Sequence, residues 1–174
     1  MGRLPRGSMG HPVVDTTEIS KWFKRAQKGD ETAISRLIDL TQTHLYRFCL
    51  YLTNDPQKAE DITQETLIKV LENLDSIEDP TKLMSWLFRA AKNRFIDGVR
   101  SPQAKEISTE GENETAFEPE PSQVDTDTVL GVRNALAALT EDERAVLVLI
   151  DSEGHTYEEA AQVIGITEEA VRSR

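Results

Sequence analysis

The sequence predicts an all-α protein: two small helical domains, joined by a flexible acidic linker, with a C-terminal helix-turn-helix. Three observations predict this class. Apolar residues recur with the spacing of amphipathic helices, and no segment shows the two-residue period of a strand. This pattern disappears between residues 101 and 127, which are acidic and poor in apolar residues. The final stretch, HTYEEAAQVIGITEEAVRSR, has the outline of two short helices around a glycine turn.

Four helices are expected in the N-terminal part, and each has a start or stop signal. Asp15 opens the first helix, and the second ends before an Asn-Asp-Pro turn. Asp30 caps that long second helix, and Gly29 separates it from the first. Proline at the first helical position, at Pro56 and again at Pro80, begins the third and fourth helices.

The C-terminal part carries two capping boxes, in which a threonine is followed three residues later by a glutamate. Thr140 with Glu143 and Thr156 with Glu159 each predict the start of a helix, and Thr167 can cap a third. The apolar residues expected on the first of these helices are Val146, Leu147 and Ile150.

These signals divide the chain into four parts. Residues 1–12 contain LPRGS and resemble the remnant of a purification tag. An N-terminal helical domain is expected at 13–101, an acidic linker at 102–127 and a helix-turn-helix domain at 128–174. We expect the last helix to be truncated, because the chain stops at Arg174 where that helix becomes basic.

The charge distribution narrows the possible partners. The net charge of −11 is unusual for a nucleic-acid binder, but residues 82–100 hold five basic residues and one acidic residue. On a helix, Arg89, Lys92, Asn93 and Arg100 fall away from the apolar face and are free for phosphates or base edges. The alternative is a solvated helix around a core tryptophan, Trp86.

The third predicted helix has one polar face, formed by Asp61, Gln64, Glu65 and Lys69. The polar face of a helix is usually just solvated, so this pattern alone identifies no partner.

The composition also predicts several absences. The three histidines and the single cysteine have no partner at metal-ligand spacing, and no phosphate-binding glycine loop follows a strand. We therefore expect no enzymatic activity, metal, cofactor or small-molecule substrate. Cys49 lies in an apolar run and is expected in the core. Without an apolar span or signal peptide, we expect a cytoplasmic protein that does not insert into membranes.

Two sets of motifs occur in a fixed order. DITQETLIKV and SWLFRAAKNRFIDGVR come first, and LTEDERAVLVL and YEEAAQVIGITEEAVRSR follow the acidic linker. In this combination the chain resembles a bacterial RNA polymerase sigma factor of the extracytoplasmic-function group, from about Asp15 to Arg174. The resemblance implies promoter recognition, promoter opening and transcription initiation together with core RNA polymerase, and regulation by an anti-sigma protein.

The resemblance also implies a role for each stretch. The candidate polymerase contacts are Asp61, Gln64, Glu65 and Lys69. The loop from Asn73 to Thr81 and the following helix would capture the unwound strand at the minus-ten element, with candidate contacts at Lys82, Arg89, Lys92, Asn93 and Arg100. The last helix would read the minus-thirty-five element in the major groove, with Thr167, Arg172, Ser173 and Arg174 as candidates.

Several alternatives remain open from the sequence. The acidic linker either mimics RNA in a basic channel of the polymerase or is a solvated tether between two DNA-binding domains. The chain could instead be a stand-alone helix-turn-helix regulator, which would bind its operator without polymerase. It could also be a helical polymerase-binding adaptor without DNA contact, which would show no promoter selectivity.

Overall fold

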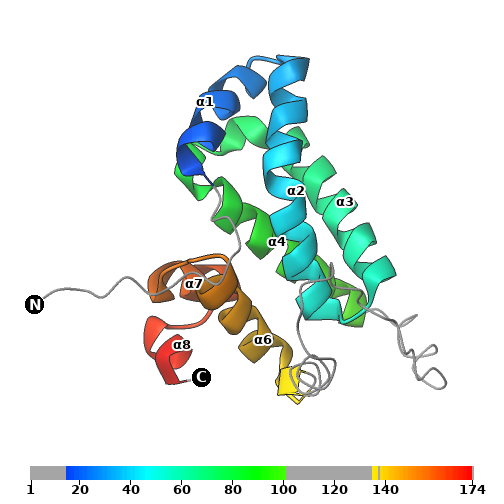
Figure 1. Ribbon diagram of the computed structural model, residues 1–174, viewed down its shortest axis with the longest axis vertical. Helices are drawn as coiled ribbons and strands as arrows, with labels where there is room; N and C mark the ends of the chain where they lie inside the picture. Colours follow the sequence, from blue (N-terminus) through cyan, green and yellow to red (C-terminus); the bar gives the residue numbers. More distant parts are fainter. Residues whose placement is uncertain (1–14, 101–134, 137, 174) are drawn as a thin grey trace, which may run out of the picture.

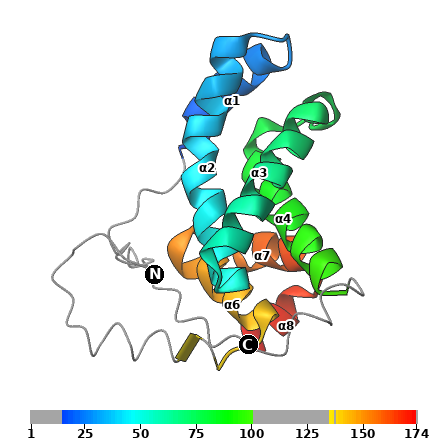
Figure 2. The same ribbon diagram turned by 90° about the vertical axis from the view of Figure 1, so that its right-hand side faces the viewer.

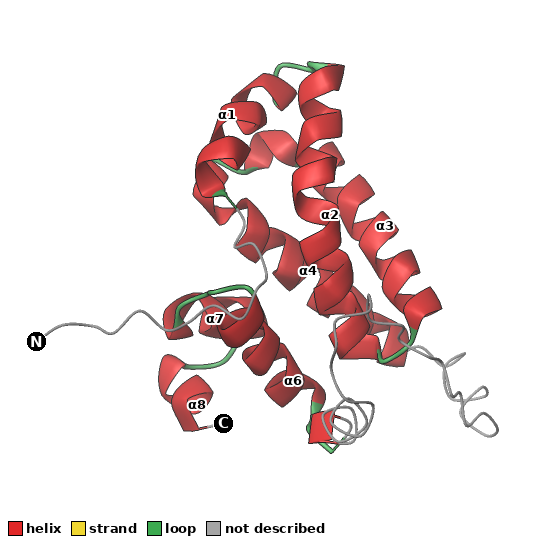
Figure 3. Ribbon diagram, in the orientation of Figure 1, coloured by secondary structure: helices red, strands yellow, loops and turns green. Residues whose placement is uncertain are grey.

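The structure is a computed structural model that describes residues 15–100, 135–136 and 138–173. Within these residues it contains helices and no strand, as the sequence predicts (Figure 3). The N-terminal helices are α1 (Thr16–Ala26), α2 (Glu31–Thr53), α3 (Pro56–Glu72) and α4 (Leu83–Arg100), and the C-terminal helices are α6 (Glu141–Leu147), α7 (Tyr157–Ile164) and α8 (Glu168–Ser173). The predicted linker, and most of the helix expected before Thr140, lie outside the described residues.

The N-terminal helices form a bundle in which α2 and α3 lie side by side and α4 crosses both of them (Figures 1 and 2). The short helix α1 packs on α2. The predicted start signals are confirmed, because the side chains of Asp15, Asp30 and Asp55 each accept hydrogen bonds from backbone amides in the first turn. Each carboxylate thus satisfies amides that have no partner within the helix.

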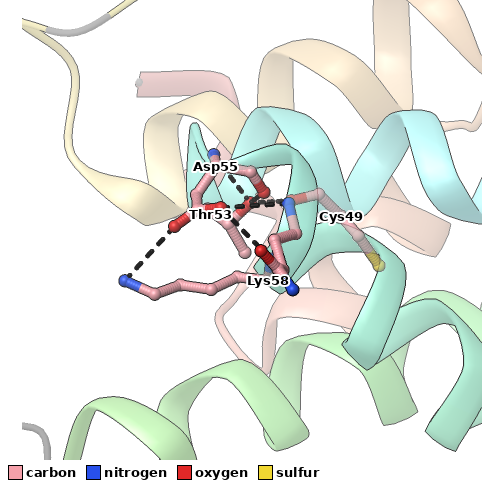
Figure 4. A network of polar contacts seen from close by, with 5 residues as sticks. Cys49, Thr53, Asp55 and Lys58 are labelled. Carbon is pink, nitrogen blue, oxygen red and sulfur yellow. Dashed lines mark hydrogen bonds and ion pairs between the residues drawn. The ribbon is translucent and has the colours of Figure 1, made fainter. Parts of the chain in front are cut away.

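The turn between α2 and α3 is closed by a small polar network (Figure 4). The Thr53 hydroxyl lies 2.9 Å from the carbonyl oxygens of both Cys49 and Asp55, and it accepts the Asp55 amide at 3.2 Å. Lys58 reaches back to the Asp55 carboxylate at 3.5 Å. Asn54 supplies the left-handed residue that ends α2, with φ of 51°. These contacts hold the turn that joins α2 to α3.

The core of the bundle is aromatic. Phe48 of α2 and Phe88 of α4 are fully buried, and their ring centroids lie 4.8 Å apart. Cys49 is also buried, as expected, and burial raises the pKa of its thiol to about 11. The thiol is therefore a neutral packing group.

The C-terminal helices confirm both capping boxes and add a feature that the sequence did not predict. After α6 the chain widens into a π-helical segment, η4 (Val148–Ser152), before the loop to α7. The prediction that Leu147 belongs to the apolar face is wrong, because Leu147 is 40% exposed while Val148 and Leu149 are buried. A π segment adds a residue to a helical turn, which shifts the face that the following residues present.

The C-terminal helices pack directly on the N-terminal bundle. Helix α7 lies against α4, and α6 contacts α2, at the lower end of the molecule in Figures 1 and 2. The buried apolar residues of the two groups are therefore continuous with one another. This arrangement places residues that are far apart in sequence within hydrogen-bonding distance.

Candidate functional site

The polar face of α3 has the exposure that an interaction surface needs. Asp61, Gln64, Glu65 and Lys69 are all exposed, while Thr63 and Val70 on the opposite side of the helix are buried. The only side-chain contact described for Gln64 is a 3.2 Å hydrogen bond to Glu60, one turn away on the same helix. The four predicted residues thus form a continuous outward-facing strip, which we call the α3 strip.

One residue of the α3 strip also joins two helices. Arg94 of α4 donates from Nη2 to Glu65 Oε1 at 3.1 Å, and its Nε contacts the other carboxylate oxygen. The Arg94 guanidinium lowers the pKa of Glu65 below its ordinary value. Glu65 therefore stays ionised at neutral pH and is held at the seam between α3 and α4.

The loop between α3 and α4 is built from two short 3-10 turns, η1 (Leu74–Ser76) and η2 (Pro80–Lys82). The Gln27 amide from the end of α1 donates to the carbonyl oxygens of Leu74 and Ile77 at 3.1 and 3.2 Å. Asp79 accepts hydrogen bonds from the hydroxyl and amide of Thr81, which lower the pKa of its carboxyl group. The loop is therefore anchored at its base, with polar residues left at its surface.

Three of the predicted DNA contacts are exposed on α4 or just before it. Lys82, the last residue of η2, and Arg89 and Asn93 of α4 all face solvent. Arg100 is the last residue of α4, and its side chain lies outside the described part. Trp86 is half-buried against the core, which agrees with its predicted packing role.

Lys92 does not behave as predicted. It is only 6% exposed, and its ammonium donates to the backbone carbonyl of Ile164 at 2.8 Å and pairs with Asp142 at 3.0 Å. Ile164 is the last residue of α7, so its carbonyl accepts no hydrogen bond from within the helix. A cation at this end of the helix also interacts favourably with the helix dipole. The prediction that Lys92 is free is wrong in this arrangement, because the C-terminal helices cover it.

The helix-turn-helix has the predicted geometry. Gly165 ends α7 with φ of 82°, and the Thr167 hydroxyl accepts the Ala170 amide at 3.2 Å, which caps α8. Arg172 is exposed but ion-paired with Glu168 at 2.6 Å, and its guanidinium lies 5.5 Å from the Tyr157 ring centroid. Ser173 is exposed and donates to the Ala170 carbonyl. Arg174 lies outside the described residues.

The interface between the two groups of helices contains a buried acid that the sequence did not reveal. Glu153 follows the π-helical segment, and its side chain is 1% exposed. One carboxylate oxygen lies 2.7 Å from His44 Nδ1, and the other lies 3.3 Å from Arg47 Nη1, both on α2. Sequence spacing could not predict this contact, because more than one hundred residues separate Glu153 from His44 and Arg47.

Two further contacts complete this interface. Arg144 of α6 donates to the carbonyl of Leu52, near the end of α2, at 3.4 Å. The His155 ring meets Phe88 edge-on, with 5.4 Å between ring centroids. Burial lowers the pKa of His155, so its neutral form is the one that fits this apolar contact.

Other kinds of site are not found where the structure is described. No group of three or more His, Cys, Asp or Glu side chains converges as a metal site would require within these residues. None of the helices in the described ranges is long and apolar enough to cross a membrane.

Comparison with known proteins agrees with this organisation. Residues 37–105 match the family described as Sigma-70 region 2, and residues 130–174 match Sigma-70, region 4. The chain is 30% identical to the ECF RNA polymerase sigma factor EcfG of Rhodopseudomonas palustris, over 75% of this chain and 72% of that protein. It is 33% identical to the ECF RNA polymerase sigma factor SigE of Mycolicibacterium smegmatis, over 84% of this chain but only 60% of that protein.

A solved structure gives the same picture. The sigma factor RpoE from Bartonella quintana, crystallised in complex with the anti-sigma factor NepR, superposes with a TM-score of 0.66 at 28% identity. The superposition covers 80% of this chain and 87% of that one. Both the sequence and the fold of the described residues therefore resemble proteins of one kind.

Proposed function

This chain belongs to the extracytoplasmic-function group of RNA polymerase sigma factors, and we propose that it directs core RNA polymerase to promoters and opens them. The observation that carries the proposal is the presence of regions 2 and 4 in order on one chain. Region 2 presents the exposed α3 strip, and region 4 forms a helix-turn-helix. A stand-alone regulator would need only the second of these two parts.

We assign a separate task to each part. The N-terminal domain, assigned to 13–101, docks on polymerase through the α3 strip and holds the minus-ten strand with the η1–η2 loop and the exposed polar residues of α4. The C-terminal domain, assigned to 128–174, reads the minus-thirty-five element with α8. The exposure of Asp61, Gln64, Arg89 and Asn93 supports this division, since a buried side chain could contact neither partner.

The proposal includes what the chain does not do. Holding a flipped base and an unwound strand uses binding energy, so promoter opening of this kind needs no nucleotide hydrolysis by the sigma factor. We therefore propose a non-enzymatic subunit that acts with polymerase in the cytoplasm. By analogy with RpoE of Bartonella quintana, which was crystallised with the anti-sigma factor NepR, we also propose that an anti-sigma protein regulates it.

Run-off transcription on a promoter library tests the proposal. The chain is added to purified core polymerase, and the transcripts are compared with those from core polymerase alone. Promoter-selective transcripts that require both components are expected. Operator binding without polymerase would instead identify a stand-alone regulator, and polymerase binding without promoter selectivity would identify an adaptor.

Replacing Arg89 tests the minus-ten assignment. If Arg89 holds one backbone phosphate, Arg89→Ala should make the slope of log affinity against log salt shallower by about 0.7 to 0.9 for a forked promoter bound by the holoenzyme. Arg36→Ala is the control, because Arg36 is an exposed arginine on α2 and is not among the residues assigned to DNA. An unchanged salt slope with Arg89→Ala would return α4 to the alternative of a solvated helix.

A further inference from the structure

The outer face of α1 carries a cluster of cations to which no role has been assigned. Residues 19–29 contain Lys21, Lys24, Arg25 and Lys28 and no acidic residue, although the chain has a net charge of −11. All four side chains are exposed. Their spacing of three, four and seven residues places them on one side of the helix, opposite the buried Phe23. We call these four residues the α1 cluster.

Helix stability alone does not account for the α1 cluster. Arg25 pairs with Asp30 at 2.6 Å, but Lys21, Lys24 and Lys28 have no acidic partner within the described residues. A cation in the last turn interacts favourably with the helix dipole, but this interaction falls off within one turn and does not extend to Lys21. Lys24 and Lys28 are like charges four residues apart, which is unfavourable in a helix. An anionic partner would offset this repulsion.

The α1 cluster lies beside an aromatic ring. The ring centroid of Trp22, which is partly buried against the core, lies 5.2 Å from Lys21 Nζ and 5.0 Å from the guanidinium carbon of Arg25. Proteins that bind single-stranded nucleic acid combine cations that contact phosphates with aromatic side chains close to them. This combination favours a nucleic acid over an acidic protein as the partner.

The position of α1 indicates which nucleic acid this is. Helix α1 packs against η2, whose last residue is the exposed cation Lys82, and the Gln27 amide of α1 binds two carbonyl oxygens of the η1–η2 loop. In Figures 1 and 2 the C-terminal helices lie toward the other end of the molecule. From Lys21 to Lys28 the cluster extends about 10 Å, which matches about three phosphates of a stacked strand. A strand held by the loop therefore has a second cationic surface next to it.

We propose that the α1 cluster, together with Lys82, binds the phosphates of single-stranded DNA and extends the path of the strand held by the η1–η2 loop. The identity of that strand as the minus-ten strand rests on the proposed function. Binding of single-stranded DNA at α1 is a property of the chain itself. Because phosphates carry the contact, this surface adds affinity without reading sequence.

The first experiment locates the binding surface on the full chain. The chain is labelled with nitrogen-15 and titrated with a twelve-nucleotide oligothymidylate, and the backbone amide signals are followed by NMR. The amides of Lys21, Lys24 and Lys28 should shift together with those of the η1–η2 loop. A polyglutamate peptide of twelve residues is the control anion, and it should cause much smaller shifts on α1.

The second experiment removes the cations. Lys24→Gln with Lys28→Gln should make the slope of log affinity against log salt shallower by about 1.4, since each contact to a single-strand phosphate contributes about 0.7. Fluorescence anisotropy of the labelled oligothymidylate measures the affinity. Arg36→Gln with Lys58→Gln is the matched control, because it removes two exposed cations from α2 and α3 and changes the net charge equally. The control should keep the parent slope.

Each outcome supports or overturns the α1 assignment. Amide shifts that are absent from α1, or that polyglutamate reproduces in full, would overturn it, and the second of these results would identify an acidic protein as the better partner. Equal salt slopes for the two double variants would also overturn it, because only net charge would then matter. If α1 responds as expected but the chain gives no promoter-selective transcripts with core polymerase, the single-strand surface stands and the sigma function fails.

Discussion

Phe88→Ala is expected to lower the free energy of unfolding by about 3 to 5 kcal/mol, which is the usual cost of emptying a buried aromatic site. Phe88 is fully buried, and its ring contacts Phe48 of α2 and His155 from the C-terminal helices. Its removal would leave a cavity where α2, α4 and the helix-turn-helix meet. Urea unfolding followed by circular dichroism measures the effect.

The control for this prediction lies on the same helix. Val99 is 53% exposed, so Val99→Ala should change the free energy of unfolding by less than about 0.5 kcal/mol. A loss below 1 kcal/mol for Phe88→Ala, or equal losses for the two variants, would show that the aromatic cluster does not form the core as described.

The double variant Asp61→Ala with Gln64→Ala should weaken binding to core polymerase by about thirty- to a hundredfold, or 2 to 3 kcal/mol, if the α3 strip is the docking surface. Both side chains are exposed, and the hydrogen bond described for Gln64 stays within α3, so the fold should be unaffected. Fluorescence anisotropy with purified core polymerase measures the affinity.

The chain offers a close control for that experiment. Asp39 and Gln42 are the same two residue types at the same spacing of three, and both are exposed on α2. Asp39→Ala with Gln42→Ala removes the same chemistry from a different surface and should leave the affinity within about twofold. If both double variants bind polymerase as tightly as the parent chain, the assignment of the α3 strip is wrong.

The features that sequence could predict are those encoded within one or two helical turns. The starts of α1, α2 and α3 can be predicted from Asp15, Asp30 and Asp55, because a capping side chain acts on amides two or three residues away. The starts of α6 and α7 can be predicted from Thr140 and Thr156 for the same reason. The exposure of the α3 strip can be predicted from the sequence, because it follows from helical periodicity alone.

The features that sequence could not predict depend on contacts between distant segments. The sequence predicts that Lys92 is a free surface cation, because helical periodicity shows only that it lies off the apolar face of its own helix. Its burial follows from the Ile164 carbonyl, which is 72 residues away. Glu153 stands in a short loop without periodicity, and only the approach of His44 and Arg47 gives it a role. The sequence shows that Lys92 and Glu153 are ionisable, but it does not show which residues they pair with.

The π-helical segment determines the direction in which the residues after it are rotated about the helix axis. One residue of an α-helix corresponds to a rotation of about 100°, so the extra residue in η4 fixes the direction in which the chain leaves α6. Deleting one residue within Val148–Ser152 would turn Glu153 and the helix-turn-helix toward a different side of the N-terminal bundle. Docking of the two groups of helices is therefore sensitive to chain length in this segment as well as to side-chain chemistry.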